Sequence, residues 1–334
     1  MKIKKADVGV ALYIMAAIIM FIVPIPSWLL DILLAINISI ALTVLFATMF
    51  SKEVLDMSFF PTMLLFTTIF RIALNTSSTR LILRDGNAGN VVETFGEFVG
   101  GGDLVIGVII FIILILIQFM VINKGSERVS EVTARFTLDA MPGKQMAIDA
   151  DLNTGAITDA EAKRRREKIQ EEASFFGSMD GAVKYVKGDA VAGLLITTIN
   201  IVGGIVMGVT RQGMDITAAL NKYAILTIGD GLVSQIPSLL ISLSTGILVT
   251  KGSKDADFGT TLVSQLFGVP KALYLVGAML AILGFVTQLN TILFVGLGLV
   301  FIIVARNIEG TIETAKIEQE VDSAGMHLLA SLNR

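Results

Sequence analysis

Long apolar stretches alternate with short polar segments along most of this chain. A helix of about 20 largely apolar residues is long enough to cross a bilayer, and the pattern predicts eight such spans. One long polar interval, residues 124–187, interrupts the pattern. The sequence therefore predicts an all-α polytopic membrane protein with a small insert between spans four and five. The predicted spans cover residues 8–28, 30–50, 55–74, 103–123, 188–210, 224–250, 270–288 and 290–305.

Composition supports the membrane assignment. The chain has 334 residues, of which 54% are hydrophobic and 16% are charged, whereas soluble domains average about 25% charged residues. The first apolar stretch follows Lys2, Lys4 and Lys5, as in a signal peptide, but no small-x-small cleavage site follows it and a second apolar stretch does. We therefore expect an uncleaved first span. Four regions result: spans one to four (1–123), the insert (124–187), spans five to eight (188–305) and a polar linker (306–334).

The distribution of Lys and Arg predicts the orientation of the spans. Of 26 basic residues, 21 lie in the two terminal tails, the insert and the other segments on the same side, and four lie on the opposite side. Basic residues favour the cytoplasmic face. Both termini and the insert are therefore expected in the cytoplasm, and residues 96–103 and 210–222 are expected to face outward.

The second half of the insert predicts a helix over residues 158–176. Thr158 and Glu161 have the spacing of a capping box, and acidic residues precede a basic cluster, Lys163–Arg166. This cluster has two interpretations: a solvated helix face, or a contact with anionic lipid headgroups.

Two acidic residues inside or beside the spans are candidates for ion handling, because a charge in hydrocarbon is costly. Asp230 lies between two glycines and ahead of Pro237, which predicts a broken helix over 229–237 with exposed carbonyls that suit a cation or proton. The alternative is a carboxylate paired with an arginine for packing. Asp189 follows Lys184 and Lys187 at the predicted cytoplasmic boundary. Two roles fit Asp189 equally well. It could relay protons, or it could be an acidic residue at a helix N-terminus, where the helix dipole favours it.

Arg71 needs a partner if it is buried, because arginine stays charged. Asp31, Asp189 and Asp230 are the plausible partners, and the alternative is an Arg71 side chain that extends to a membrane interface. Small residues recur at helix-packing spacing at Gly204 and Gly208, and at Gly296 and Gly298.

Several other kinds of site do not fit the sequence. There are no cysteines, and the one histidine, His327, lies in the polar tail. The segment DADLNTG has an extra residue relative to the calcium loop of an EF-hand, since Gly155 falls at position 7 rather than 6. Residues 141–146 lack the glycine and the hydroxyl residue of a phosphate-binding loop, and no pairing of a nucleophile with a base is evident. We expect no metal site and no enzyme activity.

Residues 128–151 read RVSEVTARFTLDAMPGKQMAIDAD and closely resemble the signature of the FHIPEP family, the export-gate family of type III secretion systems. Residues 70–83, 174–204 and 229–242 also resemble family blocks, and the resemblance extends to about residue 310. The sequence of residues 133–155 resembles the flagellar branch of the family more closely than the virulence branch. The signature positions are Arg128, Glu131, Arg135, Phe136, Asp139, Pro142, Gly143, Lys144, Gln145, Asp149 and Asp151.

The resemblance implies a multi-pass protein of the bacterial inner membrane with both ends in the cytoplasm. It implies a homo-oligomeric ring that assembles with FliP, FliQ, FliR, FlhB and the basal-body ring, and it implies no nucleic acid. The family couples proton motive force, in some members sodium movement, to protein export, so H⁺ or Na⁺ is transported and no cofactor is expected. The charged positions of the family map onto Arg71, Arg80, Lys184, Asp189 and Asp230, and Asp189 becomes the leading proton-relay carboxylate.

Family members normally continue into a large cytoplasmic domain that docks chaperones and substrates. Residues 306–334 resemble the start of the linker to that domain, which leaves docking by residues 1–334 open. Three alternatives remain for the function: an ion-coupled secondary transporter, an export protein of a virulence injectisome, and a structural membrane ring whose buried charges are dispensable. The transporter is disfavoured because only one broken-helix segment is predicted, whereas transporters often carry a matched pair.

Overall fold

The computed structural model describes residues 5–100, 103–251, 258–286 and 291–310. Within these ranges the chain is almost entirely helical and contains no strand, which confirms the predicted all-α fold class. The chain forms two compact units, Met1–Asp255 and Ala256–Arg334, and each is described by itself.

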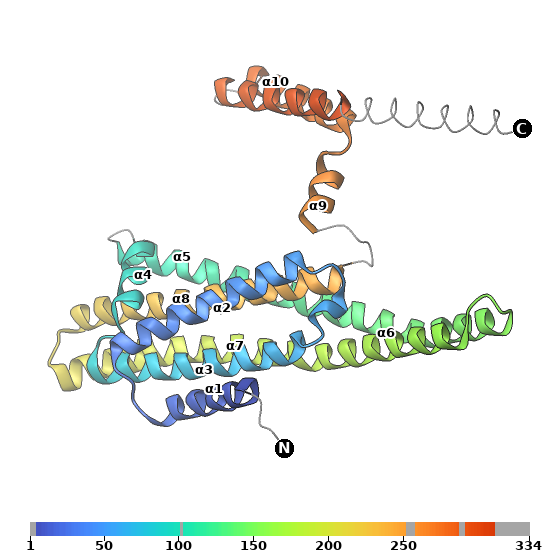
Figure 1. The fold of residues 1–334 in the computed structure, drawn as a ribbon. Helices are drawn as coiled ribbons and strands as arrows, with labels where there is room; N and C mark the ends of the chain where they lie inside the picture. Colours follow the sequence, from blue (N-terminus) through green and yellow to red (C-terminus); the bar gives the residue numbers. More distant parts are fainter. Residues whose placement is uncertain (1–4, 101–102, 252–257, 287–290, 311–334) are drawn as a thin grey trace, which may run out of the picture. The chain divides into compact units, whose positions relative to one another are not determined.

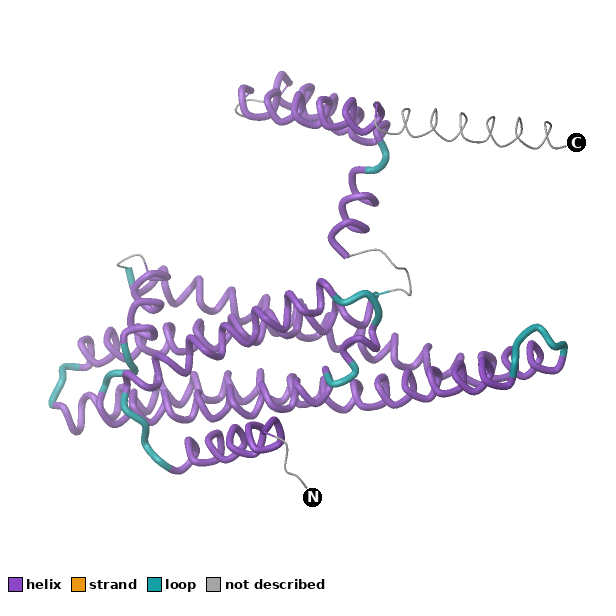
Figure 2. Tube along the Cα trace, in the orientation of Figure 1, coloured by secondary structure: helices purple, strands orange, loops and turns teal. Residues whose placement is uncertain are grey.

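The described residues of the first unit form eight α-helices, a 3₁₀ turn (η1) and a π-helical segment (η2) (Figures 1 and 2). Their bounds are α1 Lys5–Ile22, α2 Ser27–Phe50, η1 Val54–Met57, α3 Phe60–Asp85, α4 Asn90–Gly100, α5 Leu104–Ile117, η2 Gln118–Asn123, α6 Lys124–Asn153, α7 Asp159–Gln212 and α8 Ile216–Thr250.

Local sequence sets the ends of these helices. Gly86 and Gly213 follow α3 and α7 with φ angles of 61° and 63°, a left-handed conformation that glycine adopts without strain. At the N-terminus of α7, the Thr158 hydroxyl accepts a hydrogen bond of 3.3 Å from the Glu161 N–H, as the capping pattern predicts. Asp215 caps α8 in the same way, by accepting from the Thr217 N–H at 3.1 Å.

Helix α8 lies among α2, α4 and α7, and α3 packs along α7 (Figure 1). Glycines permit these close approaches. A Cβ at Gly229 would collide with the backbone carbonyl of Val92, so α8 and α4 touch backbone to backbone. A Cβ at Gly204 would collide with the Tyr223 ring, so the predicted small-residue motif in α7 serves packing against α8 of the same chain.

The insert is a helical hairpin, formed by α6 and residues 159–187 of α7, and we refer to it below as the hairpin (Figure 1). We refer to α1–α5, η2, α8 and residues 188–212 of α7 as the bundle. The predicted helix after Thr158 is confirmed, but it continues without a break to Gln212 and so joins the insert to the fifth predicted span.

The family signature is helical, which the sequence had left open. Residues 128–151 lie inside α6, and Pro142 is accommodated within the helix. The reason is helical periodicity: Met141 and Ile148 lie two turns apart and pack with Ala162 and Ile169 of α7 in a small core.

Each of the eight predicted spans contains a helix. Six described helices are long and apolar enough to cross a membrane, and a seventh is added if α9 and α10 count as one bent span. The first predicted span falls short, because its apolar helix covers only Val8–Ile22 before the Pro24 and Pro26 segment. Helix α3 extends to Asp85 rather than to residue 74, since the polar residues Ser77 and Ser78 are buried in the bundle.

The predicted break at 229–237 is also wrong, because α8 is continuous from Ile216 to Thr250 with Pro237 inside it. The glycines that suggested a break serve close packing. A Cβ at Gly231 would collide with the Phe111 ring of α5, and Gly229 is in contact with α4. Tertiary contacts along α8 therefore outweigh the loss of one helix hydrogen bond at Pro237.

The described residues of the second unit form α9 (Phe258–Phe267), α10 (Pro270–Val286) and a helix over Thr291–Gly310. α9 and α10 meet at an angle of 61°. Gly277 and Gly298 pack α10 closely against the Thr291–Gly310 helix, since a Cβ on either would lie within 3 Å of the carbonyl oxygen of the other. The predicted linker beyond Gly310, with His327, lies outside the described residues.

Candidate functional site

The strongest charged interaction within the bundle joins Arg71 of α3 to Asp189 of α7. The two side chains form an ion pair and are only 2% and 5% exposed. Among the three carboxylates proposed for Arg71, the structure thus selects Asp189, and the alternative that Arg71 extends to an interface is wrong. Asp31 instead accepts hydrogen bonds of 3.0 Å from the N–H groups of Asn90 and Val91, at the start of α4.

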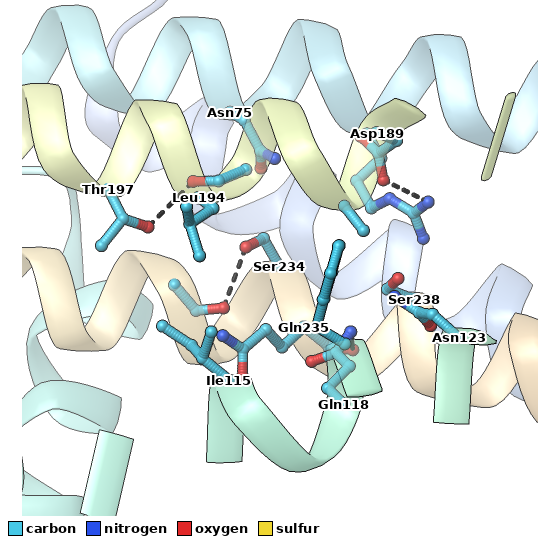
Figure 3. Close-up of a pocket in the computed structure, with 15 residues that line it drawn as sticks. Asn75, Ile115, Gln118, Asn123, Asp189, Leu194, Thr197, Ser234, Gln235 and Ser238 are labelled. Atoms are coloured by element: carbon cyan, nitrogen blue, oxygen red, sulfur yellow. Dashed lines mark hydrogen bonds and ion pairs between the residues drawn. The ribbon is translucent and has the colours of Figure 1, made fainter. Parts of the chain in front are cut away.

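A cavity of about 50 Å³ lies beside this ion pair, between α3, α5, η2, α7 and α8 (Figure 3). A buried water molecule needs about 15 Å³ by this measure, so the cavity has room for roughly three. Its lining is rich in amides and hydroxyls. The lining residues are Arg71, Asn75, Ile115, Gln118, Phe119, Asn123, Asp189, Ala190, Gly193, Leu194, Thr197, Gly231, Ser234, Gln235 and Ser238.

Several buried polar atoms of this lining have no hydrogen-bond partner among the protein groups that the structure describes. They include Arg71 Nε and Nη1, Asp189 Oδ1, Asn123 Nδ2 and Ser238 Oγ. Buried polar groups in proteins are nearly always paired, with protein or with ordered water. A polar cavity of this size satisfies the conditions for bound water, so the arrangement suits a small hydrated chamber around the Asp189 carboxylate.

Asp230 of α8 lies next to the same chamber, since the following residue, Gly231, lines it. The Asp230 side chain is buried, with 6% of the residue exposed. Asn200 Nδ2 of α7 donates to its Oδ2 at 3.1 Å, and the Ser78 hydroxyl of α3 also interacts with it. Among the described residues Asp230 forms no ion pair, so the packing alternative in which it pairs with an arginine is wrong.

Two other predicted site residues lie elsewhere. Lys184 is 67% exposed and pairs with Asp180 at 2.7 Å, so the cation beside Asp189 is Arg71. Arg80 donates to the backbone carbonyls of Phe21 and Ile22 at 2.7 and 3.1 Å, at the C-terminal end of α1. This contact satisfies carbonyls that a helix end leaves unpaired, which is a structural role.

The charged signature residues lie on the hairpin, and neither they nor the exposed Phe136 line the chamber. Asp149 and Asp151, considered above as calcium ligands, contact Arg166 at 2.5 Å and Arg165 at 3.3 Å. The basic cluster therefore pairs with acidic residues of the hairpin. The remaining ion pairs of the signature are Arg128–Glu131 at 2.8 Å, Arg135–Asp139 at 3.9 Å and Lys144–Glu172 at 2.7 Å.

Sequence reasoning missed the neutral polar residues of the site. Asn75, Gln118, Asn123 and Asn200 are all buried. Their signal lies in the sequence, since an amide inside an apolar span needs an internal partner. The π-helical form of Gln118–Asn123, which carries two of them, has no signature in the sequence.

The fold and site define a multi-pass helical membrane protein that keeps an ion pair and a second carboxylate around a polar chamber between its helices. A family model described as "FHIPEP family" matches residues 17–328. The chain belongs to this family, as the resemblance of the signature predicted.

Individual relatives agree with this assignment. The chain is 55% identical over 287 residues to "Flagellar biosynthesis protein FlhA" of Bacillus subtilis (strain 168), which is 86% of this chain and 42% of the relative. It is 52% identical over 280 residues to the protein of the same name in Salmonella typhimurium, covering 82% and 40%.

"Low calcium response locus protein D" of Yersinia pestis is 47% identical over 298 residues, covering 89% of this chain and 42% of the relative. This chain thus spans about two fifths of the length of the curated relatives it matches. No solved structure matches it.

Proposed function

We propose that this chain is the membrane part of a flagellar type III protein export gate that couples proton, or sodium, motive force to the export of flagellar proteins. In this proposal it resides in the bacterial inner membrane with both ends in the cytoplasm. It forms a homo-oligomeric ring with FliP, FliQ, FliR and FlhB as neighbours at the basal-body ring. Two flagellar biosynthesis relatives at 52–55% identity support the flagellar assignment.

The observation that carries the coupling role is the buried Arg71–Asp189 pair beside a polar chamber. Burying an ion pair between two membrane helices has a large desolvation cost, because removing both charges from water costs several kcal/mol per ion. A packing role alone could be served by apolar side chains. Access of water to the Asp189 carboxylate would give the pair a use in ion handling.

The chemistry follows from the change in charge. When Asp189 takes up a proton, its carboxylate becomes neutral and the Arg71 guanidinium loses its counter-ion. The contact between α3 and α7 is then weakened, while release of the proton restores it. Such a two-state contact lets proton binding bias the arrangement of two long helices. Because α7 continues into the hairpin, a shift of its membrane portion is transmitted to the cytoplasmic side.

The test is Asp189→Asn and Asp189→Ala in a full-length family member that carries this membrane part. We expect flagellar assembly to fail in both, with normal protein level and membrane insertion, because neither variant can bind and release a proton. Electron microscopy of filaments and swimming in soft agar measure the outcome.

The matched control is Asp180→Asn, which removes a carboxylate from the same helix at a position that is exposed and paired with Lys184. Flagella should form in this variant. Normal motility in both Asp189 variants would contradict the coupling role and favour a purely structural ring.

A second candidate is an export protein of a virulence injectisome, supported by the 47% identity to the Yersinia protein. Complementation separates the two branches. A flagellar relative whose membrane part is replaced by residues 1–310 of this chain should restore filaments in a flagellar deletion strain, and failure there with rescue of a virulence system by the corresponding virulence chimera would reverse the assignment. The transporter alternative loses its main support, since α8 is not broken.

A further inference from the structure

A second, smaller cavity adjoins the chamber beside Asp189. Its volume is about 10 Å³, close to the space that one water molecule occupies. Asn123 lines both cavities and is the residue that their linings share. The lining of the second cavity comes from α6, α7 and α8 and consists of Asn123, Ser126, Glu127, Val183, Val186, Lys187, Ser242 and Thr245.

Asn123 and Ser242 meet at this boundary. The Ser242 Oγ donates to Asn123 Oδ1 at 3.0 Å, and the Ser126 hydroxyl donates to the Ser242 carbonyl at 2.8 Å. Asn123 and Ser242 are both buried, with 7% and 2% exposure. The amide nitrogen of Asn123 has no partner among the described protein groups, so it has a donor free for a water molecule in the adjoining space.

The backbone at Asn123 is unusual. It is the last residue of η2, a π-helical segment between α5 and α6, and π-helical turns are rare and frequent at functional sites. This segment places both Gln118 and Asn123 in the lining of the chamber, as Figure 3 shows. Gln118 Nε2 also contacts the Gln235 carbonyl at 3.4 Å across the chamber.

The second cavity reaches the surface at an ion pair between Glu127 and Lys187. Their N–O distance is 2.8 Å, and their side chains are 26% and 51% exposed. Polar groups thus follow one another from the buried Asp189, past Asn123 and Ser242, to the solvent-exposed pair at the base of the hairpin.

We propose that Asn123 and Ser242 form the narrowest point of a hydrated proton path from the Asp189 chamber to the cytoplasmic surface at Glu127 and Lys187. This inference rests on the proposed coupling function. A proton that leaves the Asp189 carboxyl passes to chamber water as its O–H bond breaks and a water O–H bond forms. Water held by the Asn123 amide and the Ser242 hydroxyl passes it on to the second cavity and to solvent, so the protein ends with one proton fewer and no other bond changed.

The test is proton flux in proteoliposomes that contain this chain and an internal pH-sensitive dye, driven by an imposed pH difference. Asn123→Leu replaces the amide by an apolar group of similar size, and Ser242→Val replaces the hydroxyl by a larger apolar group. We expect each to lower the flux at least tenfold, because apolar bulk fills the constriction and leaves water neither room nor hydrogen-bond partners. Asp189→Asn serves as the reference for loss of the relay itself.

The matched control is Ser244→Val on the same helix. Ser244 is buried, its hydroxyl donates to the Leu240 carbonyl of α8 at 2.7 Å, and it lines neither cavity. Its flux should equal that of the unaltered protein. A fall in this control as large as that in Ser242→Val would mean that any lost hydroxyl in α8 stops flux, and would overturn the specific path.

Asn123→Ala distinguishes a constriction from a merely structural residue. Shortening this side chain widens the boundary and should raise the flux several-fold, whereas a packing role predicts a fall. If Asp189→Asn abolishes flux while Asn123→Leu, Ser242→Val and Asn123→Ala leave it unchanged, the path is wrong and the coupling function stands. Absence of flux through the unaltered protein would overturn both.

Discussion

The bundle and the hairpin both contain ion pairs between arginine and a carboxylate, but the Arg71–Asp189 pair in the bundle is buried and those in the hairpin are exposed. In the bundle, Arg71 and Asp189 are 2% and 5% exposed, whereas Arg128 and Glu131 in the hairpin are 72% and 55% exposed. Exposed pairs contribute about 0–1 kcal/mol to stability, but loss of one partner of a buried pair costs roughly 3–5 kcal/mol. Charge therefore contributes strongly to helix packing in the bundle, and only weakly in the hairpin that carries the family signature.

Glycines show the same contrast. In the bundle, Gly96, Gly204 and Gly229 each lie so close to a neighbouring helix that a Cβ would collide with it. In the hairpin, a Cβ at Gly143 or Gly177 would meet nothing within 4 Å. In the bundle, where buried polar groups must be paired, helix backbones approach one another closely. In the hairpin, the two helices are held together by side chains along one face.

The largest effect should follow from Arg71→Leu, which leaves Asp189 buried without its cation. We expect the free energy of unfolding in detergent micelles to fall by about 3–5 kcal/mol. The double variant Arg71→Leu with Asp189→Leu should recover most of this loss, because an apolar pair of similar volume avoids the cost of burying charge. Equal stability of Arg71→Leu and the unaltered protein would remove the energetic contrast between the two regions.

An alanine at Gly229 should have the next largest effect. Its Cβ would collide with the Val92 carbonyl, so α4 and α8 must separate, and we expect a loss of about 1–3 kcal/mol. The paired control is Gly177→Ala in the hairpin, where the added methyl group meets open space and should stabilise the helix by about 1 kcal/mol. Thermal unfolding of both variants under one condition measures the difference, and changes of the same sign would contradict the contrast in packing.

The smallest effect should come from Arg166→Ala in the hairpin. Arg166 and Asp149 are 48% and 55% exposed, so loss of their pair should change stability by less than about 1 kcal/mol. Screening by salt should reduce even this difference. The measurement is the unfolding midpoint at low and high ionic strength, and a loss comparable to that of Arg71→Leu would show that the hairpin pairs are energetically coupled after all.

Much of the fold was predictable because hydrophobic periodicity and length act locally. The eight apolar segments, the polar insert and the Thr158 cap were read from residues close together in the chain. The errors have tertiary causes. A proline and two nearby glycines predicted a break in α8, yet close contacts with α4, α5 and α7 keep it helical. The helical form of the signature was not predicted, because it depends on the partners that Met141 and Ile148 have in α7.

The candidate site divides in the same way. Asp189, Asp230 and Arg71 could be named from the sequence, because a charge in an apolar span is costly wherever it lies. The partner of Arg71 was open among three carboxylates until α3 and α7 were seen to pack along each other. The neutral half of the site, with Asn123 and Ser242 far apart in the chain, emerged only when η2 and α8 were brought together.

Sequence by itself determined that the chain is a helical membrane protein, to which family it belongs and which residues carry charge in its spans, since composition, spacing and motif are written along the chain. Tertiary structure alone decided which charges are paired, where buried polar atoms leave room for water and which glycines hold helices together. Those properties depend on distances between residues of different helices that lie far apart in the chain, and local preference carries no information about them.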